Sequence, residues 1–343
     1  MRVLAIESSC DETSIAIVED GTVVRSNIIA TSAAAFQASG GVIPEEAARK
    51  QVESILPVLK QAFVDGLTWN DIDAVAVTKG PGLLGSLLVG TVTARAIASV
   101  HGKPLFGIHH TLGHLSSTWL DTAADDAPQF PIITLSASGG HTELWYRVSH
   151  TQGSLIGRTR DDAAGEAYDK GAVLLGLPYP GGPSIGKSAM EGNPNAYELP
   201  MPLKKEDTLD YSFSGLKTAL RYLLRDDPSA KDRINDVAAS FQAAINLHLV
   251  ERIKKALGKY PDVREVHIVG GVSANTELRK LAQEVCGNGV TVRFPKTIRY
   301  CTDNAAMIAS AAYFLQKELP DIAVKSFETE ASLPLTEAVH TMA

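Results

Sequence analysis

One supersecondary pattern occurs twice in this chain of 343 residues, and it limits the available folds more than any other feature. In the first copy, the apolar run Val3–Glu7 leads into the polar loop Ser8–Thr13, after which β-branched residues resume. In the second copy, Phe130–Ser136 leads into the glycine-containing loop Ala137–His141 and then into Thr142–Val148. Each copy predicts a strand, a hairpin loop and further strands. Two copies about 130 residues apart indicate a duplicated protein with two lobes.

Strands and helices alternate after each copy, which predicts the α/β class with a mainly parallel, helix-covered sheet in each lobe. Ligands of such sheets bind beyond the carboxyl ends of the strands, so the expected site is the cleft between the lobes. The expected helices are 44–66, 84–100, 162–177, 215–224, 234–257, 275–285 and 304–318, and the expected later strands are 73–78, 105–108, 266–270 and 290–294.

Composition and charge narrow the function classes. The net charge of −7 gives no global positive field, which disfavours nonspecific binding of polyanions but leaves a local basic patch or a basic partner open. The odd set of three cysteines has no C-x-x-C pair and suits a reducing compartment. No apolar run is expected to reach the roughly 18 residues of a membrane span, and no signal peptide is recognised. We therefore expect a cytoplasmic protein with no membrane partner.

The stretch His110–His114 is the strongest chemical signal. Two histidines four residues apart share one side of a helix and can offer two nitrogen ligands to one metal ion. No Glu follows His110, and the metalloprotease pattern H-E-x-x-H needs that Glu as its general base. A metal centre without its own base favours a Lewis-acid or substrate-anchoring role.

Four polar or glycine-rich loops lie at the ends of expected strands or helices, where proteins commonly bind phosphate groups. Backbone N–H groups of such loops approach phosphate closely, and a helix N-terminus adds a favourable dipole. The loops are Ser8–Thr13, Ser138–Thr142, Pro180–Pro183 and Gly270–Asn275.

Taken together, these residues resemble bacterial tRNA adenosine threonylcarbamoyltransferases of the TsaD family, once described as O-sialoglycoprotein endopeptidases. The matching stretches follow the family order across almost the whole chain. They are Ile6–Thr13, Gly40–Glu45, Gly80–Leu83, His110–His114, Ser138–Thr142, Asp161–Lys170, Tyr179–Pro183, Phe213–Thr218, Gly270–Asn275 and Thr302–Asn304.

The resemblance implies the duplicated two-lobe, actin-like ATPase fold with a nucleotide and metal cleft between the lobes. It implies an N-terminal lobe at 1–115, a C-terminal lobe at 116–320 with a helical insertion at about 160–225, and a tail at 321–343 that packs back on the N-terminal lobe. The implied reaction transfers threonylcarbamoyl from threonylcarbamoyl-AMP to N6 of the adenosine next to the anticodon, position 37, of ANN-decoding tRNAs, and releases AMP. The implied partners are tRNA, a TsaB-like inactive paralogue and a TsaE-like ATPase.

The resemblance also assigns roles to individual residues, by their positions in the matching motifs. His110, His114 and Asp303 would hold one divalent metal, Fe²⁺ or Zn²⁺. Asp11 and Glu12 are the catalytic candidates, because a carboxylate helps an amine that becomes cationic during attack. The residues expected to bind the adenylate are Ser136, Ala137, Ser138, Gly139, Gly140, Asp169, Gly182 and Asn275.

Three departures from the family pattern stand out. Leu112 stands where many bacterial relatives carry Glu, Gln51 replaces a common His, and the tail Lys325–Leu335 lacks the usual basic-aromatic ending. Two alternative functions stay open from the sequence: a metalloprotease and a non-catalytic, nucleotide-binding regulatory subunit. For the regulatory subunit, replacing His110 or Asp303 by Ala would leave function intact.

Overall fold

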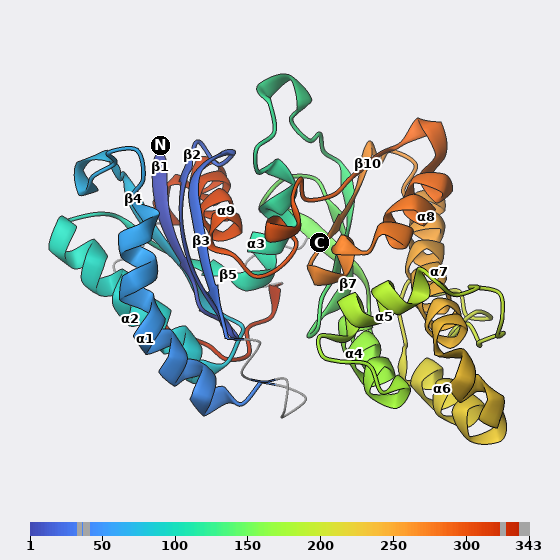
Figure 1. Ribbon diagram of the computed structural model, residues 1–343. Coiled ribbons are helices and arrows are strands. Elements are labelled where there is room, and N and C mark those ends of the chain that lie inside the picture. Colours follow the sequence, from blue (N-terminus) through green and yellow to red (C-terminus); the bar gives the residue numbers. More distant parts are fainter. Residues whose placement is uncertain (33–35, 37–41, 323–326, 336–343) are drawn as a thin grey trace. The chain divides into compact units, whose positions relative to one another are not determined.

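The computed structural model describes residues 1–32, 36, 42–322 and 327–335, and it divides into two compact units (Figure 1). Unit 1 comprises Met1–Pro128, Val148–Ser154 and Pro295–Ala343, and unit 2 comprises Gln129–Arg147 and Leu155–Phe294. These units differ from the expected lobes at 1–115 and 116–320, since residues 116–128 and 148–154 also belong to unit 1. The segment after residue 294 belongs with unit 1, because its helix packs against the first sheet.

Unit 1 is built on a five-stranded sheet of order β3-β2-β1-β4-β5. The hairpin strands pair antiparallel, β1 with β2 and β2 with β3, whereas β4 and β5 join β1 in parallel. Both faces of the sheet are covered, so the central strands are buried almost throughout. The strands are β1 (Arg2–Glu7), β2 (Glu12–Glu19), β3 (Val23–Thr31), β4 (Ala74–Gly80) and β5 (Leu105–His109).

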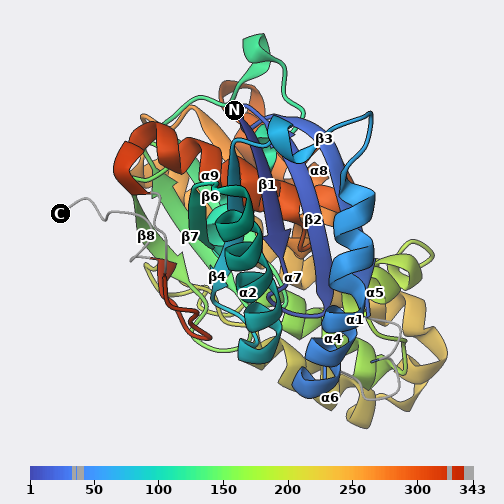
Figure 2. The same ribbon diagram turned by 90° about the vertical axis from the view of Figure 1, so that its left-hand side faces the viewer.

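The helices of unit 1 cover the two faces of this sheet. Figures 1 and 2 show α1 and α2 on one face and α9 on the other, and α9 also packs against α3. Pro44 opens α1 with Glu45 and Glu46 in the first turn, where acidic side chains favour the helix dipole. The helices are α1 (Pro44–Ala62), α2 (Leu84–His101), α3 (His110–Ser116) and α9 (Ala305–Glu318).

Unit 2 repeats the same sheet topology, with the order β10-β9-β6-β7-β8. Its hairpin β6–β7 is antiparallel, and β9 and β10 extend the sheet in parallel. The strands are β6 (Ile132–Ala137), β7 (Thr142–Arg147), β8 (Gly153–Arg158), β9 (Glu265–Val269) and β10 (Thr291–Arg293). The helices are α4 (Ala164–Leu175), α5 (Gly181–Ala189), α6 (Ser214–Asp226), α7 (Ile234–Lys259) and α8 (Thr276–Cys286).

Two sequence expectations about the fold need correction. The sheets are mixed rather than mainly parallel, because each repeated hairpin adds antiparallel pairs to a parallel half. The Pro180–Pro183 stretch was expected to be a loop, but Gly181 opens the helix α5. Short 3-10 helices connect the elements at Trp69–Asp71, Ser117–Trp119, Ala124–Asp126, Pro228–Arg233, Gly271–Ala274, Gly287–Gly289, Ile298–Tyr300 and Pro320–Ile322.

The helix α2 is long and apolar enough to cross a membrane by length and composition alone, contrary to the expectation from the sequence. This is weak evidence for a membrane, because a helix that packs in a protein core passes the same test. In unit 1, α2 packs against β4 and α1, with Leu87, Ala94 and Ile97 buried.

Candidate metal centre and nucleotide loops

The two histidines of the His110–His114 stretch lie one turn apart on α3, immediately after β5 ends. Their ring centroids are 4.8 Å apart, and the rings meet edge to face. Asp303 lies just before α9, and its Oδ1 atom is 3.4 Å from Nε2 of His110 and 3.1 Å from Nε2 of His114. The three candidate ligand atoms all lie within 4.8 Å of one another. Unit 1 therefore brings together the three residues predicted as metal ligands.

Hydrogen bonds behind His110 favour metal ligation. Nδ1 of His110 lies 3.1 Å from Oε2 of the fully buried Glu7 and 3.2 Å from Oγ of Ser9. A ring nitrogen that donates to a carboxylate leaves the other nitrogen of a neutral imidazole free to ligate a metal. Glu7 is itself held by bonds from the backbone N of Ser9 and from Oγ1 of Thr78. The motif around Glu7 contained this buried carboxylate, but nothing in the sequence showed that it faces His110.

The local charges fit a cation. Burial opposes a charge on His110, but the carboxylates of Asp303 and Glu7 outweigh burial and raise its pKa well above the ordinary value. Burial also opposes the charge on Asp303, yet His110 and His114 lower the pKa of that carboxyl. A divalent ion would replace the proton that these groups share. Two imidazole nitrogens and one carboxylate oxygen suit Zn²⁺ or Fe²⁺, and three protein ligands leave positions for substrate oxygens.

The acidic loop of the first hairpin lies in the same unit. Glu12 begins β2, and burial together with the carboxylates of Asp303 and Asp11 raises its pKa well above the ordinary value. The neighbouring Cys10 has its pKa raised by burial and by Asp11, so its thiol stays protonated at neutral pH and is a poor nucleophile.

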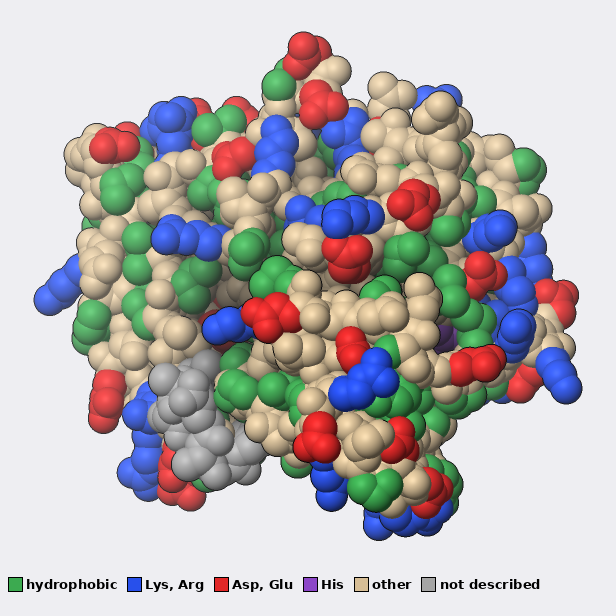
Figure 3. Space-filling model, turned by 45° about the vertical axis from the view of Figure 1, so that its right-hand side comes forward, with side chains coloured by type: hydrophobic (Ala, Val, Ile, Leu, Met, Phe, Trp, Pro, Cys, Tyr) green, Lys and Arg blue, Asp and Glu red, His purple; other side chains and the backbone are tan. Residues whose placement is uncertain are grey.

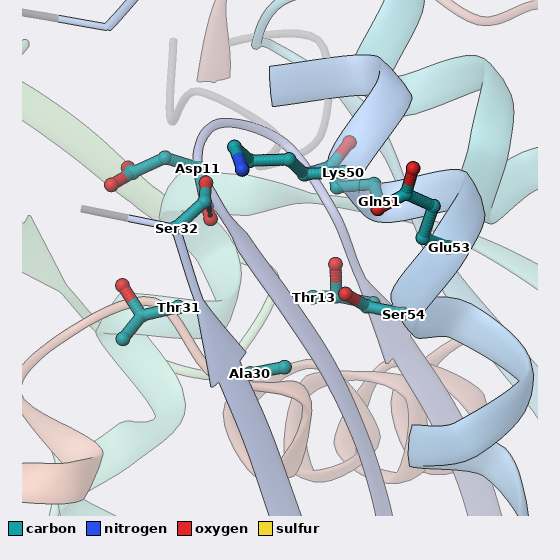
Figure 4. A pocket seen from close by; sticks show the side chains of 9 residues that line it. All are labelled: Asp11, Thr13, Ala30, Thr31, Ser32, Lys50, Gln51, Glu53 and Ser54. Atoms are coloured by element: carbon teal, nitrogen blue, oxygen red, sulfur yellow. Dashed lines mark hydrogen bonds between the residues drawn. The ribbon is translucent and has the colours of Figure 1, made fainter. Parts of the chain in front are cut away.

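Asp11 lines a polar pocket of about 310 Å³ (Figure 4). Thr31 and Ser32 at the end of β3 line it from one side, and Lys50 and Ser54 of α1 line it from the other. Gly40 and Gly41 of the family-like stretch lie outside the described residues.

Gln51 holds the acidic loop in place. It is buried on α1, and its Nε2 atom donates to the backbone oxygens of Ser8 at 3.3 Å, Cys10 at 3.0 Å and Glu12 at 2.9 Å. Its Oε1 atom is buried without a partner. The sequence marked Gln51 only as a departure from the family pattern, whereas the structure makes it the support of the candidate catalytic loop.

The glycine loop of the second hairpin lies in unit 2 and is open. Its turn is closed by the backbone N of Ser138, which donates to the oxygen of His141 at 2.8 Å. A Cβ atom added to Gly139 or Gly140 would meet nothing within 4 Å. Ser136 and Ala137 are buried in β6, so their side chains are not available to a ligand. The open backbone of Gly139 and Gly140 is the part that can approach a phosphate.

The other predicted adenylate residues gather around α4. The backbone N of Gly165 donates to the oxygen of Ser138 at 3.0 Å, which ties the glycine loop to this helix. Asp169 on α4 accepts from the backbone N of Gly181 at 2.7 Å, next to Gly182 at the start of α5. Burial raises the pKa of Asp169.

Asn275 has its side chain fully engaged. Its Oδ1 atom caps α8 by accepting from the backbone N of Leu278, and its Nδ2 atom donates to Gln242 at 2.7 Å. Asn246 also donates to Oδ1, at 3.1 Å. Asn275 therefore shapes the loop that precedes α8.

Comparison with known proteins identifies the family. Residues 23–310 match the family model described as TsaD: tRNA N6-adenosine threonylcarbamoyltransferase. A protein of that name from Moorella thermoacetica is 48% identical over 338 residues, covering 97% of both chains. One from Geotalea uraniireducens is 42% identical and covers 93% of both chains.

The chain belongs to the TsaD family.

Solved structures extend the likeness to the fold alone. Component A of the (R)-2-hydroxyglutaryl-CoA dehydratase of Acidaminococcus fermentans aligns with a TM-score of 0.55 at 15% identity, covering 93% of this chain and 98% of that one. Full-length HypF aligns with a TM-score of 0.58 at 14% identity, covering 94% of this chain and 47% of that one. Together with the two mixed sheets of one topology, this confirms the duplicated actin-like ATPase fold of a TsaD family member.

Proposed function

We propose that this chain transfers the threonylcarbamoyl group of threonylcarbamoyl-AMP to N6 of adenosine 37 in ANN-decoding tRNAs. The observation that carries the proposal is the His110–His114–Asp303 group, which has the donor set of an open catalytic metal site in a TsaD family member. One divalent ion, Fe²⁺ or Zn²⁺, would bind there and supply Lewis-acid or anchoring chemistry to the substrate.

The substrate itself removes the need for a covalent nucleophile. Threonylcarbamoyl-AMP is a mixed anhydride with an activated carbonyl carbon and a good leaving group. The N6 amine forms a bond to that carbon, the bond from carbon to the phosphate oxygen breaks, AMP leaves, and the amine loses a proton. Catalysis then consists of holding the adenylate, orienting its threonylcarbamoyl end and receiving the proton.

Separate elements of the chain perform these tasks. The backbone N–H groups of Gly139 and Gly140 approach the phosphate, and Asp169 in the middle of α4 and Gly182 at the start of α5 contact the nucleoside. Glu12 is the candidate to receive the proton, because a carboxylate near an amine that becomes cationic during attack can accept it. Asp11 orients the loop that carries it.

Binding of tRNA needs a partner surface. The net charge is −7, and on the face shown in Figure 3 basic and acidic side chains are interspersed without a large patch of one sign. Neutralising several phosphates requires clustered Lys and Arg side chains. A TsaB-like paralogue and a TsaE-like ATPase therefore assemble with this chain. We infer a cytoplasmic location, which the proposed tRNA substrate and the small, odd number of cysteines support.

The partner surface lies on α1 and α2, which pack together on one face of the first sheet. Val52 and Leu56 on α1 are 62% and 60% exposed, and Val92 on α2 is 58% exposed. Contiguous exposed apolar side chains mark interaction sites, and a paralogue of this fold presents the same pair of helices in return.

The partner surface can be tested with matched aspartate variants. Leu56→Asp should abolish heterodimer formation with the TsaB-like paralogue in size-exclusion chromatography. Val173→Asp on α4, which is 69% exposed, should leave the heterodimer intact.

Reconstituted transfer tests the function directly. The full chain, its two partners, threonylcarbamoyl-AMP and an ANN-decoding tRNA should yield threonylcarbamoyladenosine, measured by mass spectrometry of nucleosides. A tRNA that carries guanosine in place of adenosine 37 is the matched control. Absence of product with both Fe²⁺ and Zn²⁺, using partners that are active with another TsaD family member, would overturn the proposal.

A further inference from the structure

We propose that residues 327–335, called the C-terminal strap below, are a positioning element for the metal-binding helix α3, and that the strap acts through His109. The proposal rests on the metal group of the proposed function and adds a support to it. Every residue involved belongs to unit 1.

The strap is docked at several points along β4, α2 and β5 (dark red in Figure 2). The backbone N of Glu330 donates to the oxygen of Lys79 at 2.9 Å, and the backbone N of Gly82 donates to the oxygen of Ala331 at 3.1 Å. The guanidinium of Arg95 donates to the oxygen of Phe327 and lies over its ring. Backbone bonds and cation–π contact together hold the strap on this surface.

The side chains of the strap pack closely against the rest of unit 1. A Cβ atom added to Gly107 of β5 would lie 2.8 Å from the ring of Phe327, so only glycine allows the ring to sit on the strand. Leu333 and Leu335 are each 5% exposed, and both are therefore part of the core. The strap is thus a structural element of unit 1 rather than a loosely attached tail.

The first connection to the metal group passes through His109. Its Nε2 atom lies 2.8 Å from the backbone oxygen of Leu333, and its Nδ1 atom accepts from the backbone N of Thr111 at 3.1 Å. A neutral imidazole has one donor and one acceptor nitrogen, and a carbonyl oxygen only accepts. Leu333 therefore fixes the tautomer that lets His109 cap the N-terminus of α3, whose first residue is the ligand His110.

The second connection passes through Ser9. Gly82, which is bonded to the strap, approaches Ser9 closely, and the backbone N of Leu83 donates to the oxygen of Ser9 at 2.8 Å. The Oγ atom of Ser9 lies 3.2 Å from Nδ1 of His110. The strap therefore supports His110 both from the start of its helix and from the loop behind its ring.

Two measurable consequences follow. Removing the cap should weaken metal binding about tenfold, the order expected for the loss of a helix cap or of an outer partner of a ligand. Coupling between binding and strap docking is also reciprocal, so metal binding must stabilise the strap.

Three variants of His109 separate the cap from the strap bond. His109→Asn keeps an acceptor at the Nδ1 position for the cap but is too short to reach Leu333. His109→Gln keeps a donor near the Nε2 position but loses the cap, and His109→Ala loses both. Zn²⁺ affinity of the full chain is measured by competition with a chromophoric chelator, and amide hydrogen exchange of residues 327–335 is followed with and without Zn²⁺.

We expect about tenfold weaker Zn²⁺ binding for His109→Ala and His109→Gln, and near wild-type affinity for His109→Asn. In the wild type, Zn²⁺ should slow exchange in the strap. This response should shrink in His109→Asn, although its affinity is kept. A merely structural histidine would not separate the two readouts in this way.

The control is His267→Ala, because His267 is also buried but lies in unit 2. It should lower stability without changing Zn²⁺ affinity or the response of the strap. Equal Zn²⁺ affinity in the wild type and all three His109 variants, with an unchanged strap response, would overturn this inference alone. Failure of the wild type to bind Zn²⁺ or Fe²⁺ would instead overturn the metal site of the proposed function.

Discussion

The two hairpin loops of this molecule occupy equivalent places in sheets of one topology, yet they carry different chemistry. At the end of β1, the Glu7 carboxylate lies behind the candidate metal ligand His110, and Gln51 holds backbone oxygens of the loop that follows. The loop after β6 presents Gly139 and Gly140 with open space around them. Duplication thus preserved the scaffold, while one loop became a carboxylate site and the other a backbone cradle.

The two loops also differ in how firmly the surrounding residues hold them. Loop one is packed against α1 and next to α3, so its side chains are fixed and their pKa values are shifted by neighbouring charges. Loop two is joined to α4 by bonds from the backbone nitrogens of Gly165 and Ala164, and its exposed glycines carry no side chains. Unit 1 should therefore determine metal binding, and unit 2 should determine nucleotide binding. The predictions below test this division.

The largest effect is expected for Asp303→Ala. Losing one of three metal ligands should lower transfer by more than about 100-fold, since loss of an outer partner alone costs 10- to 100-fold. Metal content should fall with it, whereas binding of AMP should stay within about twofold because the nucleotide loops lie in unit 2. Elemental analysis, transfer assays and calorimetry with AMP measure the three quantities. If Asp303→Ala also lost AMP binding, the assignment of metal binding to unit 1 and nucleotide binding to unit 2 would be wrong.

The converse effect is expected for Gly165→Ala. A Cβ atom there would lie 2.6 Å from the oxygen of Ser138 and 2.7 Å from the nitrogen of Gly139, so the cradle must shift. We expect about tenfold weaker AMP binding with unchanged metal content, since a misplaced cradle loses phosphate contacts.

Gly139→Ala is the matched control for the cradle, because its Cβ atom would meet nothing within 4 Å. Its AMP affinity should equal that of the wild type. Equal affinities for Gly165→Ala and Gly139→Ala would show that the position of the loop does not matter for binding.

A smaller effect is expected for Gln51→Leu. Three backbone oxygens of the first loop lose their donor, and leaving buried acceptors unpaired should lower the free energy of unfolding by about 1–3 kcal/mol. Gln51→His restores a donor of the kind common in the family and should recover part of the loss. Chemical denaturation monitored by tryptophan fluorescence gives both values, and a fully stable Gln51→Leu would remove this role for the amide.

The smallest effect at neutral pH concerns the buried histidine of unit 2. Burial lowers the pKa of His267 to about 4, below the ordinary 6.5 of an unfolded chain. As pH falls, the unfolded state binds the proton before the folded state does. The contribution of neutral His267 to the free energy of unfolding is therefore complete above pH 6.5 and is lost between pH 6.5 and 4. His267→Gln should flatten the pH dependence of thermal stability over that window. An unchanged slope would show that other groups cause it.

Much of the fold was predictable, because periodicity and turn residues are local. The helices at 234–259 and 305–318 and the parallel strands near residues 74 and 105 lie within a few residues of their expected places. The helix α5 was missed because its first turn reads Gly-Gly-Pro, which is typical of a loop. The predicted hairpins already implied antiparallel pairs. The alternation of later strands and helices nevertheless favoured a mainly parallel sheet, so the mixed pairing was not predicted.

The candidate site was predictable as a set of residues but not as an arrangement. Helical spacing joined His110 to His114, and family order added Asp303 from almost the other end of the chain. No local pattern could show that Glu7 lies behind His110 or that Leu333 meets His109, because these contacts depend on tertiary packing. The assignments of Glu12 and of the adenylate residues stay predictions.

The discontinuity of unit 1 has a consequence for biosynthesis. Unit 2 has all its residues once Phe294 has been made, whereas unit 1 still lacks the segment with α9 and residues 327–335. Asp303 follows His114 by 189 residues, so a nascent chain carries both histidines long before it can close a three-ligand site around a metal. Domains fold as units when their residues become available during synthesis. In this protein unit 1 begins first but is completed after unit 2, and a metal held by all three residues can bind only after Asp303 has been made.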